Sequence, residues 1–156
     1  MTTEAFSIRL AEIGDAERMA EVSLAARGSI GSDPRDAIAD PVRLVLVAEV
    51  GGAVVGWAKT HHYDTASGAA PAGHYLGGVN VLPDLQRRGI GSALTDARLD
   101  WIWNRAPEAW FVTNARNTAS IDPHERLGFT EIARAGKFHD TTFDGGVGIL
   151  FRAKAP

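Results

Sequence analysis

The chain has 156 residues, of which 45% are hydrophobic and 22% charged, and these proportions are typical of one soluble globular domain. Sixteen Lys and Arg residues against nineteen Asp and Glu residues give a formal net charge of −3, which argues against a broadly basic surface for nucleic acid or an anionic membrane. The chain has no cysteine, which excludes disulfides, thiolate zinc sites, iron–sulfur clusters and thiol nucleophiles. We expect one domain over residues 1–156, with no nucleic-acid and no membrane partner.

The first ten residues include an acid and lack an apolar core segment, so they do not have the pattern of a secretion signal. The longest apolar stretch further along, residues 44–48, is far too short to cross a bilayer. We therefore expect a cytoplasmic protein.

In the N-terminal half, hydrophobic periodicity predicts a strand and a helix, then a short helical turn and a hairpin of two strands rich in Val. Gly51 and Gly52 separate the two strands of this hairpin and are a two-residue turn signal. The small and polar residues 28–34 predict a loop that would suit the rim of a substrate site. The expected elements are a strand over 6–10, a helix over 15–28, a helical turn over 35–39, and strands over 42–50 and 53–63.

In the C-terminal half, strands and helices alternate, which predicts β-α-β crossovers after the early antiparallel hairpins. Pro107 ends the longer of the two helices, and a turn at residues 144–146 precedes the last strand. The expected elements are a strand over 75–82, a helix over 89–104, a strand over 110–113, a short helix over 118–127, and strands over 129–138 and 147–152. The fold class is therefore mixed α/β.

The most informative segment is residues 79–94, VNVLPDLQRRGIGSAL, an apolar strand followed by a turn and by glycines that open a helix. The amides of a helix's first turn and the helix dipole together form an anion site, and Gly89 and Gly91 lack the Cβ atoms that would hold a diphosphate at a distance. Arg87 and Arg88 add positive charge. A Rossmann site is excluded because the third glycine and the ribose-binding acid are missing, and a P-loop because no Gly-Lys-Ser/Thr follows. The alternative is that the two glycines only shape a tight turn.

Two blocks of this sequence resemble the GCN5-related N-acetyltransferase (GNAT) superfamily. Gln86-Arg-Arg-Gly-Ile-Gly91 matches that family's acetyl-CoA signature, Gln/Arg-x-x-Gly-x-Gly/Ala, and Val79-x-Val81 matches the strand whose backbone pairs with the pantetheine arm. Residues 117–129, NTASIDPHERLGF, match the family's Asn-x-x-Ala-x-x-x-Tyr-x-x-x-Gly-Phe without a gap. The resemblance covers nearly the whole chain. It implies a single α/β domain with a mixed, mostly antiparallel central sheet, a β-bulged strand and flanking helices.

The resemblance also implies acetyl-CoA as co-substrate, with no metal, and by analogy a possible homodimer. The residues that it implies for coenzyme binding are Val79, Val81, Gln86, Arg87, Arg88, Gly89, Ile90, Gly91, Ser92 and Asn117.

The second block departs from the family pattern at three places. Ser120 stands where the family usually has Ala, and Asp122 and Pro123 lie inside the presumed helix, where Pro removes a backbone hydrogen bond. We expect the helix to restart or kink there, with Asp122 as a cap. His124 occupies the position of the family's frequent tyrosine near the coenzyme sulfur. Some acetyltransferases of small molecules, the phosphinothricin type among them, have His there, which favours a small acceptor.

Acetyl transfer from a thioester to an amine needs a neutral amine, stabilisation of charge on the acyl oxygen, and a proton for the departing thiolate. By analogy with the family's bulged strand, a backbone N–H near Val81 can serve the acyl oxygen. His124 is the candidate proton donor, because a thiol of pKa about 8.5 needs only a modest acid and imidazolium titrates near 6.5. The alternative is a core or capping histidine.

The general base is left open between several residues. On the third strand Lys59, His61 and Tyr63 share one face, so only one of His61 and His62 can face a central site. On the fourth strand Tyr75 can line an acceptor pocket, or it can simply pack. A metal site is disfavoured because adjacent histidines diverge on a strand and no His-Glu-x-x-His occurs.

The sequence therefore predicts an acetyl-CoA-dependent N-acetyltransferase that transfers acetyl directly to a primary amine of a small molecule, with His124, Tyr75 and His61 as catalytic candidates. The alternatives are a protein N-terminal or lysine acetyltransferase, a non-catalytic acyl-CoA-binding or sensor domain, and a nucleotide-binding module unrelated to coenzyme A. The polar turn with His139, Asp140 and Asp144 is expected to be solvated.

Overall fold

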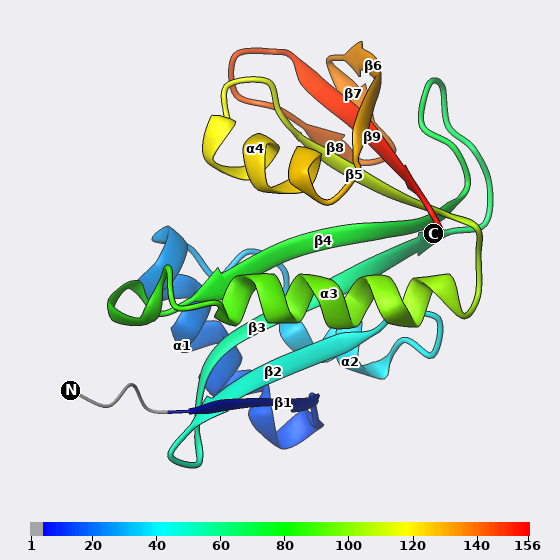
Figure 1. Cartoon of the computed structure of the whole chain (residues 1–156). Helices are drawn as coiled ribbons and strands as arrows, with labels where there is room; N and C mark the ends of the chain where they lie inside the picture. Colours follow the sequence, from blue (N-terminus) through cyan, green and yellow to red (C-terminus); the bar gives the residue numbers. More distant parts are fainter. Residues whose placement is uncertain (1–4) are drawn as a thin grey trace. The chain divides into compact units, whose positions relative to one another are not determined.

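The computed structural model describes residues 5–156, which form two compact units (Figure 1). The first unit consists of residues 5–60 and Gly77–Asp100, and the second of His61–Leu76 and Trp101–Pro156. Two long strands, β3 (Ala53–Tyr63) and β4 (Gly73–Val81), contribute residues to both units. No helix in the described part of the chain is both long and apolar enough to cross a membrane.

The first unit contains the predicted hairpin and both of its flanking helical regions. Its elements are β1 (Phe6–Leu10), η1 (Ile13–Asp15), α1 (Ala16–Arg27), α2 (Pro34–Ala39), β2 (Val45–Val50), most of β3, the end of β4, η2 (Pro83–Leu85) and most of α3 (Ile90–Trp103). The strand order is β1-β2-β3-β4, and β2 runs antiparallel to β1 and to β3. Gly51 and Gly52 have φ of 57° and 83°, the left-handed pair that a tight hairpin turn requires.

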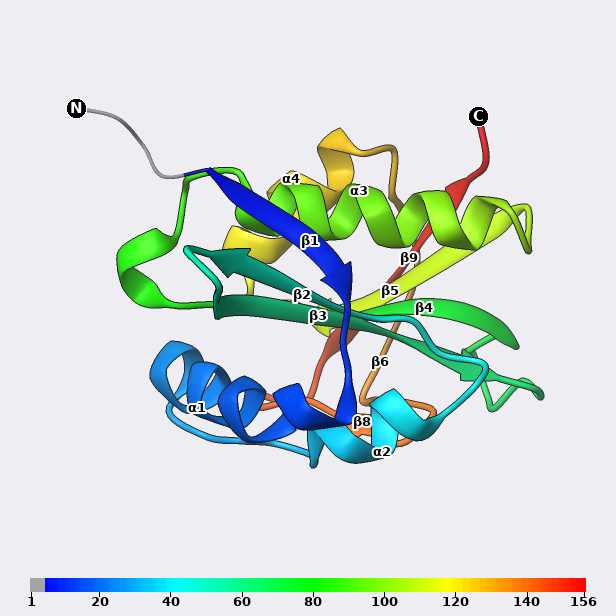
Figure 2. The ribbon, with the colours of Figure 1, turned by 90° about the horizontal axis from the view of Figure 1, so that it is seen from below.

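In the first unit, α1 and α2 cover one face of the strands and α3 covers the other (Figure 2). On the α1 face, Met19, Val22, Val47 and Trp57 belong to one buried core cluster. The indole N–H of Trp57 donates to Ser23 Oγ at 2.9 Å, so this large ring is buried without an unsatisfied polar atom. These contacts fix α1 against β3.

On the opposite face, α3 is joined to β3 and β4 by the fully buried side chain of Arg98. Its Nη1 donates to the carbonyls of Lys59 and Gly77, each at 2.9 Å, and its Nε donates to the carbonyl of Leu94 at 3.2 Å. Its Nη2 donates to Thr95 Oγ1 at 3.0 Å. Burial lowers the pKa of this guanidinium, and its hydrogen bonds compensate for the lost water. Arg98 therefore fixes α3 relative to the two strands it covers.

The second unit consists of the remaining strands and of α4 (Figure 1). Its further elements are β5 (Glu108–Asn114), α4 (Thr118–Arg126), β6 (Thr130–Ala135), β7 (Lys137–Phe138), β8 (Thr141–Thr142) and β9 (Gly148–Lys154). The start of β4 pairs in parallel with β5, where Tyr75 lies opposite Trp110. β9 lies between β5 and β6 and is antiparallel to both. The expected crossover through α4 thus joins two parallel strands that are not neighbours.

These pairings agree with the predicted mixed α/β class, because β4 pairs with β5 in parallel. The antiparallel pairs are β1–β2, β2–β3, β5–β9, β6–β9 and β7–β8. Register shifts occur in β2 between Ala48 and Glu49 and in β6 between Glu131 and Ala133. The bulge expected near Val81 remains a prediction.

Two local predictions were wrong. The single strand expected over residues 129–138 is divided at Gly136 into β6 and β7, and β7 forms a short hairpin with β8. A Cβ at Gly136 would lie 3.2 Å from the carbonyl oxygen of Gly146, so close backbone approach favours glycine at this break. The helix α4 does not restart at Asp122 but begins after Asn117 and continues through Pro123, while the alternative, a kink at Pro123, stays a prediction. Proline removes one backbone N–H from the middle of the helix. At the end of the helix, the amide of Leu127 donates to the carbonyl of His124.

Candidate functional site

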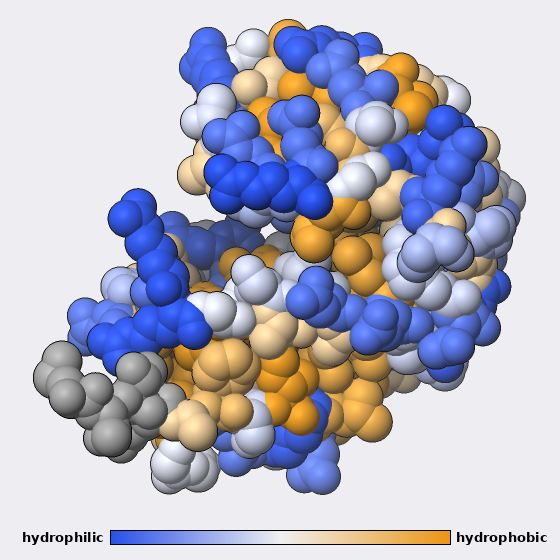
Figure 3. Space-filling model, in the orientation of Figure 1, coloured by the Kyte–Doolittle hydropathy of each residue, from blue (hydrophilic) through white to orange (hydrophobic). Residues whose placement is uncertain are grey.

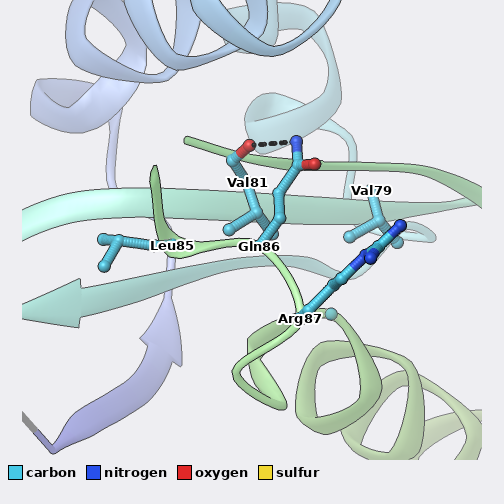
Figure 4. Close-up of a pocket in the computed structure, with 6 residues that line it drawn as sticks. Val79, Val81, Leu85, Gln86 and Arg87 are labelled. Atoms are coloured by element: carbon cyan, nitrogen blue, oxygen red, sulfur yellow. Dashed lines mark hydrogen bonds between the residues drawn. The ribbon is translucent and has the colours of Figure 1, made fainter. Parts of the chain in front are cut away.

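The loop between β4 and α3 encloses a small cavity of about 220 Å³ in the first unit (Figure 4). Its lining residues are Val79, Val81, Leu85, Gln86, Arg87 and Gly91. The side-chain amide of Gln86 donates to the carbonyl of Val81 at 3.1 Å and thereby holds the loop to the end of the strand. Small-molecule pockets commonly measure about 300–1,000 Å³, so this cavity can take only part of a large ligand.

The helix that follows this loop begins with amides that have no partner inside it. The amide of Ala93 donates to the carbonyl of Gly89 at 3.0 Å, so the helical hydrogen bonds of α3 begin at Gly89. The N–H groups of the next three residues, 90–92, therefore have no partner within the helix. Arg87 and Gly89 have left-handed φ values of 63° and 87°, and such residues curve the backbone so that its amides can face a common anion.

The surface of this loop is polar and accessible. Gln86, Arg87, Arg88 and Gly89 are all exposed, and hydrophilic side chains gather over the loop in the space-filling view (Figure 3). The two guanidinium groups add positive charge beside the open amides, which favours an anion at this helix terminus.

The two glycines of the motif are there for different physical reasons. A Cβ on Gly89 would meet no atom within 4 Å, so its left-handed φ is what favours glycine. Gly91 has no such φ, and a Cβ there would lie 3.8 Å from Val79 Cγ1, an ordinary contact. The protein itself thus tolerates a side chain at Gly91. Within the described residues, no steric contact requires glycine at this position.

The backbone near Val81 offers fewer donors than strand geometry alone suggests. The amide of Leu82 donates to the carbonyl of Val55 at 2.9 Å, and the carbonyl of Val81 accepts from Gln86. The N–H of Leu82 is therefore not available to a ligand at this end of β4.

His124 lies in the last turn of α4, in the second unit. Its Nδ1 is 2.7 Å from the carbonyl oxygen of Ser120, and because a carbonyl only accepts, Nδ1 donates. The ring stacks flat on Phe111 with centroids 3.7 Å apart and meets the ring of Phe129 edge-on at 5.5 Å. These contacts hold the imidazole in one orientation, and any proton transfer by His124 would run through Nε2. Asn117, just before α4, donates from Nδ2 to Thr113 Oγ1 at 3.2 Å.

Tyr75 and His61 belong to an aromatic cluster of the second unit. His61 stacks on Tyr63 with centroids 6.2 Å apart, and Tyr63 stacks on His139 at 3.6 Å. The buried Tyr75 hydroxyl donates to the carbonyl of Pro71 at 2.7 Å, and burial raises the pKa of its phenol. Nε2 of His139 donates to the same carbonyl at 3.0 Å. His139 is buried, so the prediction that it is solvated was wrong, whereas Asp140 and Asp144 are exposed as expected.

His61 and His62 have different surroundings, as alternation along a strand predicts. Nδ1 of His62 lies 3.3 Å from Asp64 Oδ1, and its ring is 4.5 Å from the ring of His74. Burial lowers the pKa of His74. Within residues 5–156, no three His, Asp or Glu side chains are grouped so that they could hold a metal ion.

The predicted coenzyme residues from Val79 to Ser92 thus lie together in the first unit, whereas His124, Tyr75, His61 and Asn117 belong to the second. Sequence reasoning missed Phe111, the ring on which His124 stacks, and the buried role of Arg98. Helical spacing placed Arg98 on α3, but no local signal distinguishes a buried arginine from a surface one.

Comparison with known proteins shows the family to which the chain belongs. A family model described as "Acetyltransferase (GNAT) family" matches residues 15–129, well over half of the chain. The chain therefore belongs to the acetyltransferase (GNAT) family, and the predicted family and fold class are confirmed.

Three similar proteins illustrate the relationship. A mycothiol acetyltransferase from Pseudarthrobacter chlorophenolicus is 35% identical over 94 residues, which are 58% of this chain and 28% of that protein. The ribosomal protein bS18-alanine N-acetyltransferase of Escherichia coli is 35% identical over 65 residues, 41% of this chain and 44% of the relative. The crystal structure of the enzyme of that name from Escherichia coli has a TM-score of 0.76 at 23% identity, and the match covers 96% of this chain and 94% of the other. The structure of yncA from Salmonella typhimurium with its cofactor acetyl-CoA has a TM-score of 0.71 at 22% identity, over 96% and 94% of the two chains.

The aligned segments thus span less than half of the length of these curated relatives.

Proposed function

We propose that the chain is an acetyl-CoA-dependent N-acetyltransferase that transfers acetyl directly to a primary amine of a small molecule. The observation that carries the proposal is the β4–α3 loop, where left-handed Arg87 and Gly89 precede the open amides of a helix and a cavity lies against Val79 and Val81. This arrangement fits a diphosphate at the helix terminus with an extended chain along the strand. The relative from Salmonella typhimurium, whose structure contains acetyl-CoA, supports the choice of ligand.

Acetyl-CoA would supply the activated acyl group, and the residues of this chain would bind and orient it. The amides of residues 90–92 and the guanidiniums of Arg87 and Arg88 hold the phosphates, while Gln86 keeps the loop against β4. A backbone N–H of β4, at Val81 or before it, stabilises negative charge on the acyl oxygen as the amine attacks. His124 then protonates the departing sulfur through Nε2, with its orientation fixed by the bond from Nδ1 to Ser120.

The acceptor is a small molecule in this proposal, because His124 replaces the family's frequent tyrosine and because one relative is named a mycothiol acetyltransferase. A protein N-terminus is the second candidate. It is favoured by the likeness to the ribosomal-protein-alanine N-acetyltransferase, to which the chain is similar in both sequence and structure.

The test is a panel of amines assayed by release of the coenzyme thiol, with calorimetric titration of acetyl-CoA in parallel. The panel contains amino acids, amino sugars, polyamines and drug-like amines, together with peptides that have free N-termini. Acetylation of a small amine supports the proposal, and acetylation of peptides alone supports the second candidate. Tight coenzyme binding with no transfer to any amine would contradict catalysis and indicate a sensor domain.

We also propose that residues 1–156 act as one N-acetyltransferase domain in the cytoplasm, and that the chain forms a homodimer. The first statement is supported by structural neighbours that cover 96% of the chain. Analytical ultracentrifugation tests the dimer, and a monomer at micromolar concentration would contradict it.

A further inference from the structure

A group of cations lies on the α1 face of β3 and β4, away from the coenzyme loop. Lys59 is half-buried on β3, with its Nζ 5.5 Å from the ring centre of Trp57 on the same face. This Nζ also donates to Ser32 Oγ at 3.1 Å, in the loop that connects α1 and α2. Arg27 ends α1, and its Nη1 lies 3.4 Å from the position that a Cβ of Gly78 would occupy. All of these residues belong to the first unit.

The positive charges of Lys59 and Arg27 repel one another. Among residues 5–156, neither Lys59 nor Arg27 takes part in an ion pair with a carboxylate. Burial and repulsion from the guanidiniums of Arg43 and Arg27 lower the pKa of Lys59 to about 8. Placing a half-buried ammonium beside like charges is unfavourable for the free protein, and an anion at this position would relieve it. Arg27 and Gly78 are exposed, so an anion can reach the group from solvent.

The position of Lys59 and Arg27 relative to β4 indicates which ligand would supply the anion. Val79 and Val81 line the coenzyme cavity, so the exposed Gly78, which alternates with them, faces the opposite side, where Arg27 lies. In the proposed function the coenzyme arm runs from the loop along β4, and Gly78 is about 10 Å further along the strand than Val81. The acyl end of the coenzyme would extend along β4 towards Gly78. The cations therefore lie beside this part of β4, on the face opposite the cavity.

We propose that Lys59, Arg27 and the hydroxyl of Ser32 bind an anionic group, a carboxylate or a phosphate ester, of the amine that receives the acyl group. This inference rests on the proposed function, because the bound molecule is an acceptor only if the chain transfers an acyl group to it. The anion site itself does not depend on it. The acceptor is thereby narrowed from any primary amine to an amino acid or another amine that has a negative charge.

The experiment uses paired probes that differ by one anionic group, titrated by calorimetry into the whole protein with and without saturating coenzyme A. The carboxylate pair is N-acetyl-L-alanine and N-acetyl-L-alaninamide, and the phosphate pair is O-phosphoethanolamine and ethanolamine. We expect the anion of at least one pair to bind at least tenfold more tightly than its neutral or cationic partner. The pair that shows this preference identifies the anionic group.

Variants then locate the site. The double variant Lys59→Met with Arg27→Met, which keeps the apolar stems, should reduce the preference to about one, and Lys59→Arg should retain it. Arg35→Met is the matched control. Arg35 is an exposed arginine of the same unit that pairs with Asp33 at 3.4 Å, and its loss should leave the preference intact. The affinity for coenzyme A should be the same in all four proteins.

A measurement on the wild type keeps the test valid if the double variant does not fold. The preferred anion should raise the pKa of Lys59 towards its ordinary value in an NMR titration, and its uncharged partner should not. Equal affinity within both probe pairs, or a preference that persists in the folded double variant, would overturn the anion site. Failure of the wild type to bind coenzyme A would instead overturn the proposed function, and the probe preference measured without coenzyme would still decide on the anion site.

Discussion

Replacing Gly91 by Ala should change the stability of the free protein and its coenzyme affinity in opposite directions. Gly91 lies in the first turn of α3, where a Cβ would lie 3.8 Å from Val79 Cγ1 and would cause no overlap. Alanine is favoured over glycine inside a helix by up to about 1 kcal/mol, and a first-turn position should give part of this gain. For a chain of this size the full 1 kcal/mol would raise Tm by roughly 2–4 °C, so we expect a smaller rise.

The same methyl group should weaken coenzyme binding. A phosphate oxygen that accepts from the amide of Gly91 lies about 2.9 Å from that nitrogen, so the new methyl would be in contact with it and would displace it. Loss of one hydrogen bond to a charged group costs about 1.5–3 kcal/mol, which is roughly a tenfold to hundredfold increase in Kd. Calorimetric titration of coenzyme A measures the affinity, and differential scanning calorimetry measures Tm.

Gly14→Ala is the matched control, because a Cβ there meets no atom within 4 Å and its φ is not left-handed. This variant should leave the Kd for coenzyme A unchanged. An unchanged Kd in Gly91→Ala would mean that the phosphates bind elsewhere. A lower Tm would mean that the space beside Val79 is smaller than the structure indicates.

Three further predictions concern single side chains. Arg98→Met leaves the carbonyls of Lys59 and Gly77 without their donor, so we expect a loss of about 2 kcal/mol in urea denaturation, with partial recovery in Arg98→Lys; equal stability of Arg98→Met and wild type would refute this role. The pKa of Lys59 is lowered in the folded state, so the unfolded chain binds more protons between about pH 8 and pH 10.5, and the wild type should gain stability relative to Lys59→Met as the pH rises through that window. A stability difference between the two proteins that is constant with pH would contradict the lowered pKa of Lys59. His124→Phe should lower kcat more than it raises KM for acetyl-CoA, because the proton donated to the departing sulfur matters mainly in the transition state. In the wild type we expect kcat to fall at high pH, where a proton donor is lost, and this fall should be absent in His124→Phe, whereas an unchanged kcat would leave His124 as a packing residue.

The parts of the fold that could be predicted are those encoded by neighbouring residues. Gly51 and Gly52 specify their turn because few other residues adopt left-handed φ, and Gly28, with φ 77°, ends α1 where the pattern placed its stop. The conformation of the β4–α3 loop was predicted in the same way, because it is encoded by consecutive residues of one strand, loop and helix. Coenzyme binding by this loop stays a prediction.

What the sequence did not reveal depends on residues that are distant along the chain. His139 was expected in solvent because its neighbours are polar, but it is buried by Tyr63 and held by the carbonyl of Pro71. The cation group of Lys59 and Arg27 was missed because it joins a strand to the end of a helix 32 residues earlier, and neither residue belongs to a recognisable pattern.

The place of β9 between β5 and β6 has a consequence for how the chain is made. Both strands are synthesised before the residues that must lie between them, and each pairs along its length with β9. Until residues 148–154 have emerged from the ribosome, β5 and β6 therefore carry unpaired edges that can bind other strands. Termination of synthesis before Gly148 would leave two strands without their partner at once, so we expect such truncated chains to aggregate and not to fold into a shortened second unit.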